Sequence, residues 1–443
     1  MISISDKQKC CGCSACAQRC PKQCITMQED AEGFLYPQVD ADVCIDCGLC
    51  EKVCPFINPN DKREPIQTLA AINKNEVIRM QSSSGGIFSF VAEQIIDEGG
   101  VVFGARFDEK WQVILDYTET IDGLVAFRGS KYVQARVGST YRQCLKFLND
   151  GRKVLFSGTP CQIAGLKRYL RKDFDNLFTI DLACHGVPSP KVWKMYLDSL
   201  QKTLSINNIN MRDKQNGWKK FNFRLSYSNE ENSYELTSPA FDNDYMKAFL
   251  CNLILRPSCH DCKMKECRSN SDITLADYWG IENVSPEMND NRGTSLVLLH
   301  NEKAKALLSQ KNLKFRETSY EQAFIYNSAI IASVKPHINR NQFFAELDTN
   351  NDIVSLIKKH ATRPQSMQTK GRIKQLPYRI ARKVKHMITN VIQKKRCGGG
   401  NQQINSTLNQ TTPLVTSTQK IVDVNFRDKR TKWQHYNFTI KIR

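Results

Sequence analysis

Eight cysteines near the amino terminus have the residue type and the spacing to hold an inorganic cofactor. Two segments share the pattern C-x2-C-x2-C-x3-C-P, and their cysteines are Cys10, Cys13, Cys16 and Cys20, then Cys44, Cys47, Cys50 and Cys54. Thiolates two residues apart lie on one tight loop and can hold one face of a cubic iron–sulfur cluster, which leaves a corner open. Each segment therefore predicts a cluster-binding loop.

The two cysteine runs are 34 residues apart, which indicates an internal duplication. In two-cluster bacterial ferredoxins the fourth cysteine of each run ligates the cluster of the other run. We therefore predict two 4Fe-4S clusters, cluster I at Cys10, Cys13, Cys16 and Cys54 and cluster II at Cys44, Cys47, Cys50 and Cys20. Cys11 and Cys24 fall outside the pattern and are given no role.

Zinc and disulfides are the alternative uses of such cysteines. Zinc prefers two separated pairs of ligands, and a disulfide framework belongs in a short secreted chain, so neither accounts for two triple runs with proline after each fourth cysteine. The start of the chain, Met1 to Lys9, lacks the apolar core of a signal peptide, and no apolar run reaches about 18 residues. We therefore expect a cytoplasmic protein.

The net charge of +18 is concentrated at the carboxyl end of the 443 residues. Residues 353–422 contain 14 Lys and Arg and no Asp or Glu, whereas residues 1–352 hold 43 basic and 43 acidic residues. The body of the protein is thus neutral, and we expect no nucleic acid as a partner.

A small ferredoxin-like module, residues 1–57, is expected to precede a larger mixed α/β domain. Between the cysteine runs, Ile25 to Met27 and Phe34 to Val39 predict a hairpin, and residues 58–65 predict a linker. We divide the larger domain into residues 66–150 and 151–340.

The segment Ser82-Ser83-Ser84-Gly85-Gly86 leads into a helical pattern at Ile87 to Ile96. A glycine-rich turn that feeds a helix can present N–H groups to a phosphate, although a plain helix cap gives the same pattern. Lys131, in the segment RGSKY (128–132), could pair with a phosphate or could simply be solvated.

Residues 137–200 alternate between helical and strand patterns and predict a parallel βαβ unit. Cys161 and Cys184 each follow a predicted strand, so we expect both at one edge of the sheet. Cys161 should also lie near the amino terminus of a helix, which favours its thiolate. Cys259 and Cys262 could complete four ligands for a third cluster; the alternative is buried free cysteines.

Two different segments follow the body of the chain. Residues 353–397 predict a basic tail, in which Pro377 to Arg396 forms an amphipathic helix. Such a helix can lie on an anionic membrane, here the inner membrane face, or can pack on its own domain. The content of Asn, Gln, Thr and Ser predicts disorder for residues 398–443.

Several ordered motifs resemble the beta subunits of coenzyme F-420-reducing hydrogenase and related dehydrogenases. Beside the cysteine runs, these motifs are SSSGG (82–86), RGSKY (128–132), GTPCQIAGLK (158–167), DLACHGVPSP (181–190), RPSCHDC (256–262) and SDITLADYWGI (271–281). The resemblance covers residues 1–340 and leaves out the tail.

The resemblance implies FAD and a third 4Fe-4S cluster. It assigns the flavin site to Ser83, Ser84, Gly85, Gly86, Lys131 and Tyr132, and the third cluster to Cys161, Cys184, Cys259 and Cys262, with Cys267 as a substitute or spare ligand. It implies an iron–sulfur flavoprotein oxidoreductase, in which FAD passes electrons between the clusters and a hydride carrier (coenzyme F-420-like or nicotinamide) or an organic substrate. A ferredoxin or a partner oxidoreductase is the expected protein partner.

Two alternatives remain open at the level of sequence. The chain could be a ferredoxin-dependent reductase of a sugar intermediate in surface-polysaccharide synthesis, because the family has relatives among such genes. It could also be a non-catalytic electron-transfer adaptor, in which the larger domain only docks a partner.

Overall fold

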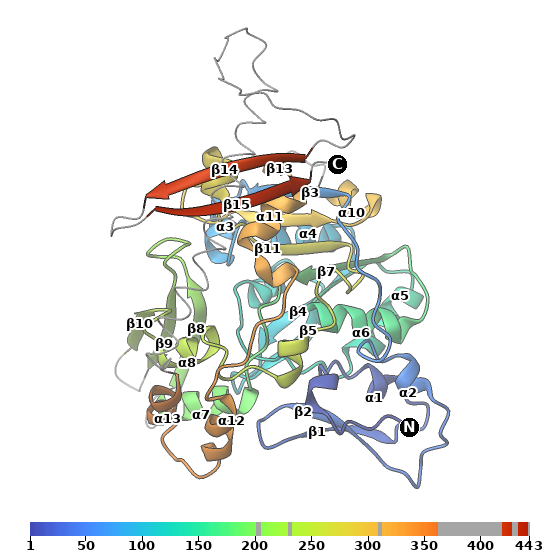
Figure 1. Ribbon diagram of the computed structural model, residues 1–443. Coiled ribbons are helices and arrows are strands. Elements are labelled where there is room, and N and C mark those ends of the chain that lie inside the picture. Colours follow the sequence, from blue (N-terminus) through green and yellow to red (C-terminus); the bar gives the residue numbers. More distant parts are fainter. Residues whose placement is uncertain (201–204, 229–232, 309–311, 362–418, 428–432, 442–443) are drawn as a thin grey trace. The chain divides into compact units, whose positions relative to one another are not determined.

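The computed structural model describes residues 1–200, 205–228, 233–308, 312–361, 419–427 and 433–441 (Figure 1). The chain divides into two units, Met1–Gln365 and Ser366–Arg443. The first unit carries every residue that the motifs single out. It combines a small cysteine-rich module with a mixed α/β domain, as predicted.

The amino-terminal module shows its duplication in the backbone. It contains α1 (Ala15–Arg19), a hairpin of β1 (Ile25–Glu29) and β2 (Leu35–Val39), and α2 (Leu49–Lys52). Gly12 and Asp46 occupy equivalent positions with φ of 70° and 46°, and Ser14 and Gly48, with φ of 62° and 67°, precede the two helices. These left-handed residues bend each cysteine run into the tight loop that the spacing predicts.

The larger domain is built on an eight-stranded mixed sheet with the order β13-β3-β12-β11-β7-β6-β4-β5. Neighbouring strands are parallel from β4 through β6 and β7 to β11, and antiparallel elsewhere. The strands are β3 (Gln67–Asn73), β4 (Val101–Phe107), β5 (Val113–Thr118), β6 (Val154–Ser157), β7 (Leu177–Leu182), β11 (Ile273–Asp277), β12 (Ser295–Leu299) and β13 (Leu313–Thr318). The predicted βαβ unit is confirmed as β6, α6 and β7.

Helices cover both faces of this sheet, because alternate strand residues point to opposite sides. Val102 and Leu155 pack in one cluster with α4 (Ile87–Asp97). Their neighbours Val101 and Phe156 pack in another cluster with α5 (Thr140–Asn149) and α6 (Pro160–Leu170). The second cluster also contains residues of the cysteine module, so the module lies on the α5 and α6 side of the domain.

A second core joins the module to a three-stranded antiparallel sheet. The order of that sheet is β10 (Ser233–Pro239), β9 (Asn222–Ser228) and β8 (Ser205–Asp213), and it packs with α7 (Pro190–Leu200) and α8 (Asp244–Leu250). Phe34 and Tyr36 of the module lie in the same buried cluster as Trp193 of α7. The module is therefore held by two separate cores.

The remaining elements are short. They are α3 (Glu76–Gln81), α9 (Ile281–Val284), α10 (Glu302–Leu307), α11 (Tyr320–Tyr326) and the 3-10 turns η1 (Lys7–Lys9), η2 (Asp122–Phe127), η3 (Pro257–Asp261), η4 (Pro286–Met288) and η5 (Ser328–Ile330).

The carboxyl-terminal region differs from expectation in two places. The body extends beyond residue 340, because α12 (Arg340–Glu346) and α13 (Ile353–His360) pack together and Leu356 and Ile357 are buried. The start of the predicted basic tail is thus a core helix. Pro377 to Arg396 lies outside the described residues. Within the described part of the chain, no helix combines the length and the apolar character needed to span a membrane.

The second unit contains an antiparallel hairpin where disorder was expected. β14 (Gln419–Arg427) pairs with β15 (Trp433–Lys441). Apolar residues alternate with polar ones in both segments, at Val422, Val424 and Phe426 and at Tyr436, Phe438 and Ile440. This period of two favours strands. The prediction of disorder rested instead on the polar composition of residues 398–418.

Candidate functional site

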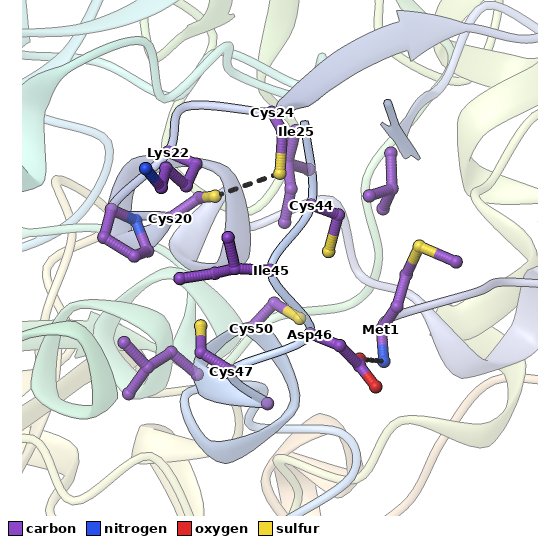
Figure 2. Close-up of a pocket in the computed structure, with 14 residues that line it drawn as sticks. Met1, Cys20, Lys22, Cys24, Ile25, Cys44, Ile45, Asp46, Cys47 and Cys50 are labelled. Atoms are coloured by element: carbon purple, nitrogen blue, oxygen red, sulfur yellow. Dashed lines mark hydrogen bonds and ion pairs between the residues drawn. The ribbon is translucent and has the colours of Figure 1, made fainter. Parts of the chain in front are cut away.

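The cysteines predicted for cluster II line a single pocket. Cys44, Cys47 and Cys50 of the second run reach it together with Cys20 of the first, which is the crossed assignment that the spacing predicts (Figure 2). Cys47 is exposed to solvent and Cys50 is buried. Of the two cluster positions, this one therefore has an exposed ligand.

Cys24 adds a fifth thiol to this pocket, which the sequence pattern did not predict. Its Sγ lies 3.4 Å from Sγ of Cys20 (Figure 2). The contact with Cys20 raises the pKa of Cys24 to about 11. Burial works against the Cys20 thiolate, but hydrogen bonds to Cys24 and nearby backbone groups hold the pKa of Cys20 below its usual value.

The cysteines predicted for cluster I are less exposed than those of cluster II, and Cys10 and Cys54 are partly buried. Cys13 and Cys16 are buried. Burial, followed by the charges of Cys10 and Cys54, raises the pKa of Cys16 to about 12. Charge repulsion of this kind requires the thiols to lie close together. The positive charge of bound iron would offset it and stabilise the sulfurs as thiolates.

The α/β domain packs directly against the cluster I position. A Cβ atom added to Gly165 of α6 would lie 3.0 Å from Sγ of Cys13. Gln18 of α1 accepts hydrogen bonds from the backbone N–H groups of Tyr141 and Arg142, at 3.1 and 3.3 Å, and so satisfies free donors at the start of α5. Helix α1 is thus anchored to α5 and lies against α6.

A third group of thiols is brought together by separate parts of the domain. Cys161 lies in the first turn of α6, and Cys184 follows β7. Cys259 lies in the turn η3, and Cys262 directly follows that turn. Burial, then the charges of the other cysteines of this group, raises the pKa of Cys259 above its usual range. Cys267 is buried near Tyr320, with 4.0 Å between Sγ and the hydroxyl oxygen.

Cys161 occupies the predicted position at the amino end of α6. Its pKa, however, is raised and not lowered, so the expected stabilisation of a thiolate is not found. Contact with Cys11 and burial raise the pKa of Cys161 well above its usual value and outweigh the hydrogen bond with Thr159, whose hydroxyl is 3.2 Å away. Cys11 also lies beside Cys13, a cluster I cysteine. Cys11 therefore lies between cluster I and the third group of thiols.

None of these positions is arranged for a single ion. In the described residues, no three His, Cys, Asp or Glu side chains converge as ligands of one metal ion. A cubane cluster differs from such a site because each cysteine binds a different iron atom.

The two segments predicted to bind flavin lie next to each other. The hydroxyl oxygens of Ser83 and Ser130 are 2.7 Å apart. Ser84 donates its hydroxyl proton to the carbonyl of Thr294 at 2.9 Å, and the N–H of Gly85 is bonded to the Ser295 hydroxyl. The hydroxyl of Ser84 and the N–H of Gly85 are therefore already hydrogen-bonded to residues at the start of β12. Gly86 has a left-handed φ of 82° at the start of α4.

Lys131 is held by its own segment. Its ammonium donates to the carbonyls of Arg128 and Gly129, at 3.0 and 3.3 Å. Burial lowers the pKa of Lys131 to about 7. The side chain is therefore on the border between charged and neutral at physiological pH.

Arg212 is a functional candidate that the sequence reasoning missed. Its buried guanidinium pairs with Asp277 at 2.8 Å, donates to the Tyr132 hydroxyl at 3.1 Å, and lies over the rings of Phe221 and Trp279. Among the residues that the structure describes, two of its buried nitrogens, Nε and Nη2, have no hydrogen-bond partner. Unpaired buried donors are costly, so they favour an acceptor at this position. The only sequence signal was the motif DYWG, which contains Asp277 and Trp279.

Comparison with known proteins confirms the resemblance. Residues 151–321 match the family model that describes the carboxyl terminus of the coenzyme F420 hydrogenase/dehydrogenase beta subunit. Residues 9–57 match a 4Fe-4S dicluster domain. Separate parts of the chain are thus similar to a two-cluster iron–sulfur domain and to the carboxyl terminus of this beta subunit.

Curated relatives match part of the chain. A subunit of F(420)H(2) dehydrogenase from Methanosarcina mazei is 23% identical over 186 residues, which cover 40% of this chain and 53% of that protein. An uncharacterized protein of Methanocaldococcus jannaschii is 22% identical over 203 residues, 39% of this chain and 56% of that protein. A 7Fe ferredoxin of Hydrogenibacillus schlegelii is 48% identical over 42 residues, 10% of this chain and 47% of that protein. The chain thus spans about half the length of the curated relatives it matches.

One similar solved structure is a chain of the F420-reducing NiFe hydrogenase complex from Methanosarcina barkeri. The TM-score is 0.41 with 16% sequence identity, over 67% of this chain and 91% of that chain.

Proposed function

We propose that this protein is an iron–sulfur flavoprotein oxidoreductase that moves electrons between three 4Fe-4S clusters and FAD. The electrons would come from, or go to, a hydride carrier such as coenzyme F-420 or a nicotinamide, or an organic substrate. The observation that carries the proposal is the position of Cys11 between Cys13 and Cys161. It makes the cysteine groups of the module and of the larger domain neighbours.

The order of the thiol groups supports a single route for electrons. Cys47 opens the cluster II position to solvent, and Cys50 of that position lies close enough to Cys16 and Cys54 to affect their pKa values. The cluster I position is followed by Cys11 and then by the third group at Cys161. A redox partner protein would therefore exchange electrons at the exposed end, beside Cys47.

The residues beside the two serine segments fit an anionic, hydrogen-bonding ligand such as FAD. The hydroxyls of Ser83 and Ser130 and the two unpaired nitrogens of Arg212 would serve as its donors. FAD, when bound, exchanges two electrons with a hydride carrier and one electron at a time with a cluster. The role of the protein is to orient the ligand and to offset its negative charge with Arg212.

An electron-transfer adaptor is the second candidate, and one observation favours it. Lys131, Ser84 and Gly85, which the resemblance assigns to flavin, are bonded within the protein. In an adaptor these residues would only stabilise the domain, and the module would supply electrons to a partner enzyme.

Anaerobic reduction of the purified protein separates the two candidates. Reduced coenzyme F-420, NADH, NADPH and reduced ferredoxin are added in turn while flavin absorbance is recorded. Bleaching by any donor supports the oxidoreductase, and the donor that acts names the electron input. Arg212→Met should lower the flavin content while iron stays unchanged. A protein that binds no flavin and has unchanged properties in Arg212→Met would be an adaptor.

A further inference from the structure

Arg256 connects the cysteine module to the loop that carries Cys259 and Cys262. Its side chain is completely buried. Its guanidinium donates from Nε to the carbonyl of Cys10 at 2.8 Å and from Nη2 to the carbonyl of Leu35 at 2.9 Å. Nη1 donates to the side-chain oxygen of Gln134 at 3.0 Å. These three acceptors come from separate segments of the chain, so the guanidinium is fixed from several sides.

The same guanidinium contacts a predicted ligand of cluster I. Nη2 lies 3.8 Å from Sγ of Cys10. The group stacks over the rings of Tyr36 and Phe34, at 4.2 and 5.3 Å from their centroids, so water is excluded on that side. A Cβ atom at Gly12 would lie 2.8 Å from Nη1. The first cysteine run therefore has glycine at the point where the arginine crosses it.

A buried cation normally requires a negative partner. Within the described part of the chain, the polar contacts of Arg256 are two carbonyls, one amide and one sulfur, and none is a carboxylate. A 4Fe-4S cluster with four thiolate ligands is an anion, and it gains one further negative charge when it takes up an electron. The cluster is thus the available counter-ion of Arg256.

We propose that Arg256 is a positioning residue that favours the reduced state of cluster I over that of cluster II. This inference rests on the proposed function only in requiring that cluster I is present. The charge of Arg256 is close to Cys10. In the described part of the chain, Arg256 makes no such contact with a cysteine of cluster II. Cluster I would then hold an electron that has passed cluster II, on the way to the third group.

The test is the reduction of each cluster at a fixed potential in the full-length protein. The hyperfine-shifted β-proton signals of the ligand cysteines report the reduced fraction of the two clusters separately. The potential is set with dithionite and mediators so that half of cluster I is reduced in the unmodified protein. In Arg256→Gln the ratio of reduced to oxidised cluster I should fall about tenfold, equivalent to about 59 mV for one electron. The ratio for cluster II should change less than about twofold.

Two variants control for loss of structure. Arg340 is also buried, donates to the carbonyl of Leu255 and pairs with Glu32 of the module. Its hydrogen bonds within the described residues go to these two partners and not to a cysteine. Arg340→Gln should leave both ratios unchanged. Arg256→Lys keeps the charge and should lower the ratio for cluster I less than Arg256→Gln does.

A further variant decides the matter if Arg256→Gln fails to hold cluster I. Gln134→Glu leaves Arg256 in place but gives it a carboxylate partner of similar shape, so the ratio for cluster I should fall in the same direction. Unchanged ratios in Arg256→Gln or in Gln134→Glu, with full iron content, would overturn the proposal. Iron analysis of the unmodified protein tests the presence of the clusters independently.

Discussion

The two halves of the cysteine module have the same sequence pattern and the same backbone turns, but opposite surroundings. The cluster I position lies against α6, beneath Arg256, and has buried cysteines at Cys13 and Cys16. The cluster II position lies in a surface pocket with Cys47 exposed (Figure 2). Duplication produced two equivalent binding loops, and the larger domain then made them different.

One pair of equivalent positions, Gly12 and Asp46, shows most clearly why the surroundings of the two halves differ. Gly12 and Asp46 both have positive φ, but only Gly12 lies under a guanidinium. Asp46 instead bonds the amino group of Met1 at the surface. The local chain therefore sets the shape of each loop, and tertiary contacts decide its burial and electrostatics.

Removing one ligand from each half should give the largest difference between them. Cys47→Ala should lose about four irons, those of cluster II, and keep cluster I, because residue 47 is exposed and its loss leaves the core intact. Cys13→Ala should lose both clusters and much of the folded protein, since Cys13 packs against α6 and belongs to a buried core. Iron content and circular dichroism of the two variants measure this. Equal effects would show that the halves are not different in burial.

Oxidative damage should also distinguish the two clusters. Ferricyanide with a chelator should remove cluster II at least about tenfold faster than cluster I, because solvent reaches its ligand Cys47. Iron release followed by absorbance should then have a fast phase of about four irons from cluster II and a slower phase from the other clusters. The slow phase should become fast in Gly165→Ala, whose added methyl group would press on Cys13. A single phase in the unmodified protein would contradict the difference in burial.

Alanine at the two equivalent turn positions should have unequal costs. Gly12→Ala combines a left-handed backbone with a clash at Nη1 of Arg256, for about 2–4 kcal/mol of lost stability. Asp46→Ala keeps a non-glycine residue in a left-handed turn at the surface and should cost about 0.5 kcal/mol. Thermal unfolding of both proteins under anaerobic conditions compares them. A small loss of stability in Gly12→Ala would show that the guanidinium of Arg256 does not lie against residue 12.

The smallest effect concerns a second region, the one that we propose to bind flavin. Burial holds the pKa of Lys131 at about 7, so this side chain is charged below that pH and neutral above it. If it attracts an anionic flavin phosphate, affinity for FAD should fall about threefold between pH 6 and pH 8, the size of a weak ion pair. Lys131→Met should show no such change. Fluorescence titration with FAD measures both, and parallel pH profiles would exclude a role for Lys131.

Regular patterns allowed much of the fold to be predicted. The spacing of the cysteines predicted that Cys20 would lie with Cys44, Cys47 and Cys50, and these four line one pocket. That part was predictable because the geometry of such loops is local and repeated. Apolar runs located the hairpin of β1 and β2 and the strands β6 and β7, and the βαβ rule placed Cys161 and Cys184 at one sheet edge. The helix α13 and the hairpin of β14 and β15 were missed, because charge and polar composition outweighed short apolar periods.

Residues that act through distant tertiary contacts could not be found in the same way. Arg212 and Arg256 act through contacts with residues far away in the sequence, such as Asp277 and Cys10. A single arginine has no spacing to recognise, and its burial depends on the whole fold. Cys11 was left without a role for the same reason, since its partner Cys161 lies 150 residues away.

Anaerobic iron, sulfide and flavin analysis of the full-length protein tests the central claim most directly. Two clusters in the module, a third at Cys161 and its neighbours, and one flavin predict about twelve irons and one FAD per chain. Cys259→Ser should then reduce the iron to about eight and leave the module intact. About eight irons and no flavin in the unmodified protein would contradict the account and leave only an electron-transfer adaptor.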